Sequence, residues 1–309
     1  MNNKIRIGAI VMLTAILGIS ICGCKGNSTG GKPTSSMNQM ASEDSLQLPL
    51  PAVPEELRSP EERAAFVSSH FWDALDFSRD SRSLDTAFIE QNFANYLAVL
   101  SVTPEADARK AVSRLLTESA KSEKADGLLR HVIVKYLDDP NSPMRSEDLL
   151  IYFLEEWSKP EERDEALRLR AEHRLSEVLK NRRGTRAADF RITGSDGKET
   201  TLLKALKGET IVMFYDPDCE QCREAKELLA KSPLPEGVEL MAIDIAGDRR
   251  RHEATKGSMP EAWTVWFDSE GIEDNEKYVF QAMPTFYVLG ADGTVLMKDP
   301  PIETFLSRQ

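Results

Sequence analysis

A continuous apolar run that leads into two closely spaced cysteines restricts the fold most. Ile211–Tyr215 is apolar throughout, as expected for a strand buried on both faces of a sheet. Cys219 and Cys222 follow, where the pattern changes to that of a helix over about residues 220–231. A second apolar run, Val238–Ile243, comes next. Strand, helix and strand predict a βαβ unit with the cysteines at its first strand-to-helix junction.

The remaining carboxy-terminal segments extend this unit into an α/β domain over residues 184–309. Pro284–Leu289 is a third apolar run, and Ala291-Asp292-Gly293 predicts a tight turn into a strand over 294–297. A last helix is expected near 302–307. Together these segments predict a central mixed sheet flanked by helices.

Residues 55–182 have the signals of helices instead. Ser59 and Glu62 flank Pro60 in the arrangement of a capping box, and Thr103-Pro104-Glu105 is a second helix-start signal. Leu167, Ala171, Leu175, Val178 and Leu179 recur on one helical face. The fold class predicted is α + α/β, an all-helical domain followed by the α/β domain. Helices are expected over 60–76, 83–101, 104–121, 124–138, 145–157 and 161–181.

The first residues are typical of an export signal. Ile7–Cys22 is an apolar run too short for a standard membrane span and suited to the core of a signal peptide. The following Gly23-Cys24 resembles the bacterial lipoprotein signal, in which a small residue precedes the cysteine that is lipidated. We therefore expect lipidation at Cys24 and attachment to the membrane through that lipid anchor. An uncleaved single-span anchor is the alternative.

These boundaries divide the chain into four parts. Residues 1–23 are expected to be the signal peptide, 24–50 a flexible tether poor in apolar residues, 51–183 the helical domain and 184–309 the α/β domain. This organisation predicts a periplasm-facing lipoprotein of the cell envelope, on the inner or the outer membrane.

Composition excludes several functional classes. The net charge is −12 and 29% of residues are charged, which argues against a nucleic-acid binder and a multi-span membrane protein. Four cysteines are too few for a disulfide-dense scaffold. Arg223 follows Cys222 where covalent haem attachment needs histidine. Because no second Cys/His cluster accompanies the cysteine pair, we expect neither a metal nor a cofactor.

Two resemblances follow from particular motifs. The carboxy-terminal part resembles the thioredoxin superfamily, most closely the TlpA-like membrane-tethered thiol–disulfide oxidoreductases. The segments 70–77 and 136–145 resemble the helical domain of unknown function that precedes a thioredoxin-like domain in Bacteroidetes-type lipoproteins. The motifs that carry the first resemblance are Ala188-Asp189-Phe190, Asp196-Gly197-Lys198, Lys207-Gly208, Cys219-Glu220-Gln221-Cys222 and Met283-Pro284-Thr285.

The thioredoxin resemblance implies roles for individual residues. Cys219 would be the attacking thiol and Cys222 the resolving one. Pro284 would follow a cis peptide bond and turn the adjoining backbone toward a substrate peptide; an ordinary edge-strand start is the alternative. The implied partners are protein thiols and disulfides, and a membrane electron donor or redox partner. The substrate-binding residues expected around the pair are Met283, Thr285, Tyr215, Glu220 and Gln221.

Three carboxylates near the attacking cysteine suggest the direction of the reaction. Asp216, Asp218 and Glu220 oppose the helix dipole, which predicts a pKa of Cys219 near or above the value of about 8.5 for free cysteine. A less stabilised thiolate makes a more reducing couple. The chain is therefore predicted to reduce or resolve protein disulfides.

The sequence also departs from the family pattern. Asp218 occupies the position usually held by tryptophan, and Met213 the position of the buried acid of many thioredoxins. Neither Glu224 nor Glu227 clearly matches the acid of TlpA-like proteins, so the proton acceptor for Cys222 is unassigned. His252 is expected on a solvated surface helix.

A non-enzymatic lipoprotein is the alternative function. Its helical domain would bind a partner, and the thioredoxin fold would serve as a scaffold. An enzyme of this family would turn over disulfides through Cys219, whereas such a binding protein would not.

Overall fold

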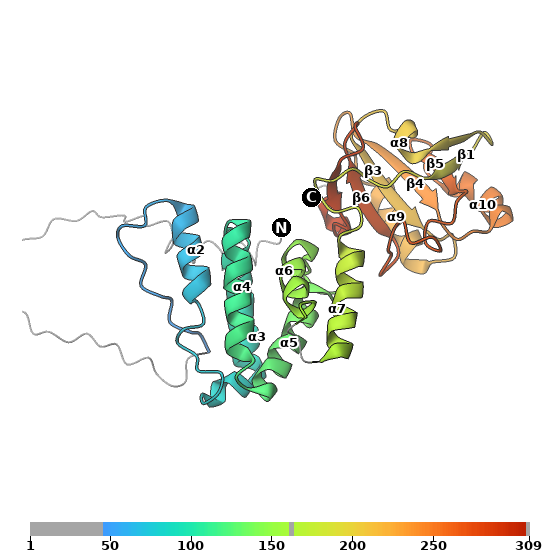
Figure 1. Ribbon diagram of the computed structural model, residues 1–309. Helices are drawn as coiled ribbons and strands as arrows, with labels where there is room; N and C mark the ends of the chain where they lie inside the picture. The colour runs from blue at the N-terminus through green and yellow to red at the C-terminus, as the bar shows by residue number, and fades with distance from the viewer. Residues whose placement is uncertain (1–45, 161–163, 307–309) are drawn as a thin grey trace, which may run out of the picture. The chain divides into compact units, whose positions relative to one another are not determined.

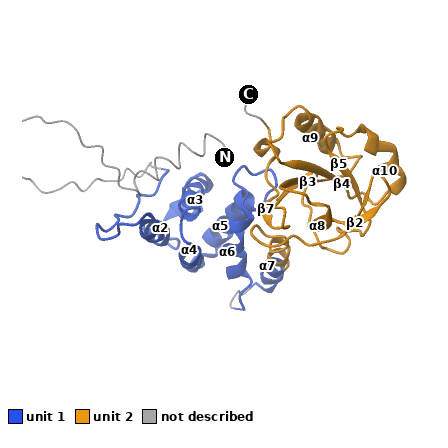
Figure 2. Ribbon diagram, turned by 90° about the horizontal axis from the view of Figure 1, so that it is seen from above, with its two compact units in different colours: residues 1–172 blue, residues 173–309 orange. Residues whose placement is uncertain are grey.

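The computed structural model describes residues 46–160 and 164–306, and the chain divides into two compact units, Met1–Glu172 and His173–Gln309 (Figure 2). The expected signal peptide and Cys24, together with most of the tether, lie outside the described residues. In the part of the chain that is described, no helix has both the length and the apolarity needed to cross a bilayer.

Unit 1 is built from helices, as the capping and periodicity signals predicted. The first helix ends at His70 rather than at residue 76, because turns follow that place Phe71, Trp72 and Leu75 in the core. A short 3-10 helix, η1 (Ser81–Leu84), precedes the second. The α-helices of this helical part, labelled in Figure 1, are α2 (Pro60–His70), α3 (Thr86–Leu100), α4 (Glu105–Ser119), α5 (Glu123–Leu137), α6 (Glu147–Trp157) and α7 (Glu165–Val178).

The two predicted helix-start signals form different hydrogen bonds. The Ser59 side chain accepts a hydrogen bond from the Glu62 N–H, and Glu62 accepts one from the Ser59 N–H, so the capping box is confirmed. Thr103 does not cap α4, because its hydroxyl donates to the Val99 carbonyl at the end of α3 (2.9 Å). Sequence alone cannot separate these uses of a threonine between two helices.

Unit 2 contains a mixed seven-stranded sheet in the order β2-β1-β5-β4-β3-β6-β7. β3 lies parallel to β4 and antiparallel to β6, and β4 lies parallel to β5. The predicted central mixed sheet is therefore confirmed. The strands are β1 (Arg191–Gly194), β2 (Glu199–Thr201), β3 (Thr210–Tyr215), β4 (Glu239–Asp244), β5 (Thr264–Asp268), β6 (Thr285–Leu289) and β7 (Val295–Lys298).

Two helices connect the parallel strands. α9 (Glu220–Ala230) joins β3 to β4, as predicted, and α10 (Arg249–Thr255) joins β4 to β5, where the sequence predicted only a surface helix around His252 and no following strand. Since both crossovers run in the same direction along the sheet, the right-handed rule places α9 and α10 on one face. The other short helices are α8 (Leu202–Ala205), η2 (Lys256–Ser258) and η3 (Ile302–Thr304), and η3 replaces the longer helix expected near 302–307.

Every residue of β3 is buried, which explains its uninterrupted apolar run. Its side chains alternate between two cores, as the pleat requires. Val212 and Phe214 pack on one face of the sheet. Ile211, Met213 and Tyr215 pack on the other face, together with Cys222, Ala225 and Leu229 of α9.

The boundary between the units lies inside α7, upstream of the expected boundary at residue 183. The Lys298 ammonium donates to the carbonyls of Val178 (3.1 Å) and Lys180 (2.9 Å) at the end of this helix. Asn181 accepts a hydrogen bond from the Ala188 N–H and donates one to the Lys277 carbonyl. These contacts attach the second half of α7 to unit 2, although its sequence pattern is purely helical.

Asp268 orders the loop after β5 and supplies a test of the fold. Its carboxylate is 5% exposed and accepts from the N–H groups of Glu270 (2.9 Å), Gly271 (3.1 Å) and Ile272 (2.8 Å). Asp268→Ala leaves these donors unpaired and should lower the free energy of unfolding by about 2–4 kcal/mol, as measured by urea unfolding of the full chain. Asp196→Ala, at an exposed turn, should cost under about 1 kcal/mol; equal losses would contradict this role.

Candidate active site

Cys219 directly precedes α9, the helix that follows the buried strand β3, and Cys222 lies in its first turn. Both elements are labelled in Figure 1. Cys219 is the N-cap residue of α9, and its sulfur accepts a hydrogen bond from the Cys222 N–H at 3.2 Å. The first N–H groups of a helix have no partner within the helix and favour negative charge. The position predicted for the attacking cysteine therefore gives its sulfur a backbone hydrogen-bond donor.

The proline loop lies beside this sulfur. The Cys219 thiol donates to the Met283 carbonyl at 3.8 Å and to the Gln221 side-chain oxygen at 3.7 Å. The Met283–Pro284 peptide bond is cis, as the resemblance implied. The alternative of an edge strand is wrong, because β6 begins directly after Pro284 and lies between β3 and β7. The fold thus brings together two motifs that lie far apart in the chain.

The expected substrate-binding residues differ in access. Glu220 and Gln221 are exposed, and Met283 and Pro284 are half-buried. Tyr215 is only 2% exposed and Thr285 only 3%.

The side chains of these two residues are buried, and substrate binding by Tyr215 and Thr285 stays a prediction. Tyr215 belongs to the core under α9, and the Thr285 hydroxyl donates to the Ala282 carbonyl at 2.7 Å. Every residue of β3 and of β6 is buried, which accounts for the low exposure of both side chains.

The charge around Cys219 also differs from the expectation. Asp218 forms an ion pair with Arg251 of α10, so its negative charge is compensated. Asp216 accepts a hydrogen bond from the Asp218 N–H at 2.7 Å, which holds this carboxylate within the loop. The sequence alone did not place α10 against the loop that leads to Cys219. Three carboxylates without a paired cation were therefore expected near this cysteine.

Cys222 is the buried member of the pair, at 3% exposure. Burial is the main cause that raises the pKa of the Cys222 thiol, and its hydrogen bond with Cys219 raises that pKa further. Cys222 therefore keeps its proton at neutral pH and must give it up before its sulfur can act as a nucleophile.

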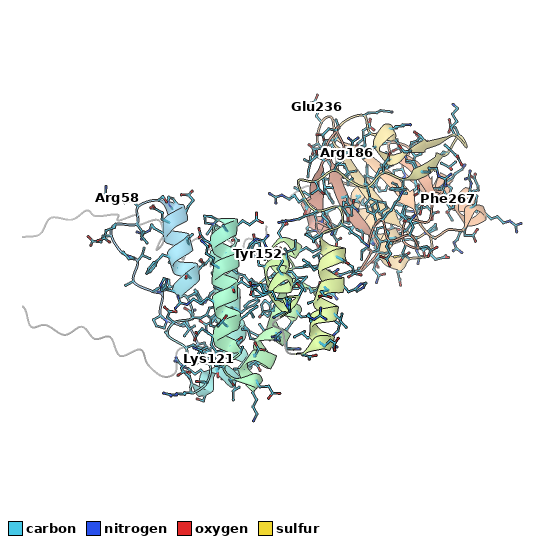
Figure 3. The ribbon with its side chains drawn as sticks, viewed as in Figure 1. Arg58, Lys121, Tyr152, Arg186, Glu236 and Phe267 are labelled. Carbon is cyan, nitrogen blue, oxygen red and sulfur yellow. The ribbon has the colours of Figure 1, made fainter. Side chains whose placement is uncertain are left out.

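His252 is buried, so the prediction of a solvated histidine is wrong. It is 1% exposed, and its Nδ1 lies 3.0 Å from the Asp244 carboxylate, which is fully buried. Its ring packs against Phe267, labelled in Figure 3, with ring centroids 5.3 Å apart. A helix that connects two parallel strands must pack on the sheet, which buries one of its sides. Recognising Thr264–Asp268 as a strand would have predicted this burial.

No group of three or more His, Cys, Asp or Glu side chains that could hold a metal ion occurs within residues 46–160 and 164–306. Asp244 and His252 form a pair, and the two cysteines form another. Two thiols at this spacing have the chemical capacity for thiol–disulfide exchange, and a carboxylate beside an imidazole has the capacity for proton transfer.

Three solved structures are similar to this chain, and the first of them supports the thioredoxin-like fold. A thioredoxin-like protein from Bacteroides caccae is 28% identical, with a TM-score of 0.73, over 83% of this chain and 95% of that chain. The carboxy-terminal domain of an uncharacterized protein from Bacteroides fragilis is 28% identical, with a TM-score of 0.39, over 41% and 95%. A putative thiol-disulfide oxidoreductase from Bacteroides vulgatus is 13% identical, with a TM-score of 0.36, over 41% and 99%.

Family comparison concerns mainly the helical part of the chain. No curated protein matches the chain significantly. The family model described as Domain of unknown function (DUF5106) matches residues 22–181. Since this match spans more than half of the chain, the protein belongs to the DUF5106 family.

Proposed function

We propose that this protein is a thiol–disulfide oxidoreductase that reduces or resolves disulfides in other proteins. The observation that carries the proposal is the position of Cys219, whose sulfur accepts the Cys222 N–H (3.2 Å) and lies beside the Met283 carbonyl (3.8 Å). One cysteine is accessible and the other is buried behind it, which separates an attacking from a resolving sulfur.

The reaction consumes one substrate disulfide and yields two substrate thiols. The Cys219 thiolate attacks one substrate sulfur, so a mixed disulfide forms and the other substrate sulfur leaves as a thiolate. Cys222 then loses its proton and attacks the Cys219 sulfur, which releases the second substrate sulfur. The protein is left with a Cys219–Cys222 disulfide, and a dithiol partner must reduce it before the next turnover.

The reducing direction and the location are part of the proposal. Asp216 and Glu220 lie close to Cys219 and Cys222 in sequence. Their negative charge disfavours a thiolate in the reduced, dithiol form of the protein. The Gly23-Cys24 signal supports a lipid anchor in the cell envelope, where a membrane dithiol donor can reach the site.

Cysteine variants test the proposed reaction directly. The reduced full chain should reduce insulin, and Cys219→Ser should abolish this turnover because no attacking sulfur remains. Cys222→Ser should accumulate a mixed disulfide on Cys219, visible as a mass shift that dithiothreitol removes. A wild-type chain without insulin reduction would contradict the enzyme and favour the non-enzymatic binding protein.

The pKa of Cys222 predicts selective alkylation. At pH 7 iodoacetamide should modify Cys219 in the reduced chain and leave Cys222 almost unmodified, because burial raises the pKa of the Cys222 thiol and keeps it protonated. Peptide mass spectrometry measures both sites. Modification of Cys222 should require unfolding, or a pH well above the ordinary thiol value of about 8.5. Equal modification of both at pH 7 would contradict the assignment of roles.

Arg251 is expected to assist the attacking sulfur. Arg251→Gln leaves the Asp218 carboxylate uncompensated beside Cys219 and disfavours the thiolate. The alkylation rate of Cys219 at pH 7 and low salt should fall by about 2- to 5-fold, the range of an exposed ion pair. Arg250→Gln removes the same charge from the next position of α10 and should change the rate less; equal effects would show that only net charge matters.

A further inference from the structure

Asn181 is a buried polar residue just beyond the end of α7. It is 7% exposed, and its φ of 50° lies in the left-handed region. Asparagine adopts this conformation more readily than most other residues with a side chain. The chain turns here, after the last helical residue Val178, and the Asn181 side chain contacts two other segments of unit 2.

The side-chain amide of Asn181 joins two segments that lie far apart in the chain. Its Nδ2 group donates to the Lys277 carbonyl at 2.9 Å, and its Oδ1 accepts from the Ala188 N–H at 2.7 Å. The Tyr278 hydroxyl donates to the carbonyl of the same Ala188 at 2.8 Å. The Lys277 ammonium adds a more exposed contact, to the Asp189 carbonyl at 2.9 Å. Both polar backbone groups of Ala188 therefore take part in holding residues 277 and 278.

The segment that is held in this way has no regular structure of its own. Residues 269–284 connect β5 to β6 and contain neither a helix nor a strand. The position of this segment therefore depends on its contacts with the rest of unit 2 rather than on a helix or a ladder of strand hydrogen bonds. Tyr278 is 1% exposed, and Phe280 packs on Phe214 of β3 with ring centroids 5.1 Å apart.

The same segment leads to the cysteine pair. Met283 lies near its end, packs against the cores on both faces of the sheet, and has its carbonyl 3.8 Å from the Cys219 sulfur. A peptide that binds through main-chain hydrogen bonds needs a partner backbone at a fixed position. Protein substrates therefore depend on where this segment lies, whereas a small reagent that meets only the sulfur does not.

We propose that Asn181 is a positioning residue, which fixes residues 277–283 so that the backbone at Met283 can bind a protein substrate beside Cys219. This inference rests on the proposed function and deepens it. Asn181 acts through the Lys277 carbonyl, which loses a donor when the side chain is removed. This hydrogen bond joins two uncharged groups, so its loss should weaken substrate binding by about 3- to 10-fold.

Insulin reduction by the full chain, corrected for the reaction of dithiothreitol alone, measures this effect. Asn181→Gly removes both side-chain hydrogen bonds and suits the positive φ, so backbone strain does not contribute. It should raise KM for insulin by about 3- to 10-fold and leave kcat within about twofold. Alkylation of Cys219 by iodoacetamide at pH 7 should also stay within about twofold of the wild-type rate, because the sulfur itself is unchanged. Amide hydrogen exchange of residues 277–283 should become faster.

Two further variants separate the contacts of this region. Asn181→Asp keeps an acceptor for the Ala188 N–H and loses the donor to the Lys277 carbonyl, so it should raise KM as Asn181→Gly does. Lys180→Gln is the matched control, because it breaks the neighbouring ion pair with Glu276 of the same segment. Glu276 is largely exposed in this pair, so Lys180→Gln should leave both KM and hydrogen exchange unchanged.

The outcomes distinguish this role from the proposed function. A wild-type KM in Asn181→Asp would overturn the positioning role, and it would do so even if Asn181→Gly failed to fold. Equal losses in insulin reduction and in Cys219 alkylation would also overturn it, because they would show general damage to the site. Wild-type hydrogen exchange of residues 277–283 in Asn181→Gly would overturn this inference alone. A wild-type chain that reduces no insulin would overturn the proposed function itself, and the positioning role with it.

Discussion

The hydrogen bond from the Cys222 N–H to the Cys219 sulfur is the interaction through which the fold positions the cysteine pair. It exists because β3 is buried over its whole length and ends where α9 begins, which makes Cys219 the N-cap of that helix. The same turn that leaves Cys219 accessible carries Cys222 into the core. One local structure therefore separates a sulfur that can meet a substrate from a sulfur that cannot.

Elements with a strong local signal could be predicted from the sequence. β3, α9 and β4 follow from uninterrupted apolar runs around a helix, and the helices of unit 1 follow from caps and periodicity. β5 was missed because its first residues are only half-buried and its pattern is weak. Because β5 was not predicted, the helix around His252 was assigned to a surface insertion. The burial of His252 was therefore not expected.

The cysteine pair and the proline loop of the site could be predicted from the sequence. The pairing of the charged side chains around them could not. Cys219, Cys222 and Met283 come together as their motifs implied. The pairing of Asp218 with Arg251 depends on how α10 packs, which no spacing in the sequence encodes. Tyr215 lies near the motif in sequence, yet the alternation of β3 directs its side chain into the core. Proximity in sequence therefore located the two sulfurs better than it located the side chains around them.

α10 contacts the site through two consecutive residues that face different environments. Arg251 pairs with the exposed Asp218, which precedes Cys219 in the chain, and His252 pairs with the buried Asp244 at the end of β4. An exposed ion pair is weak and screened by salt, whereas a buried pair is costly to break. The inner contact therefore fixes α10 on the sheet. The outer contact can break without moving the helix.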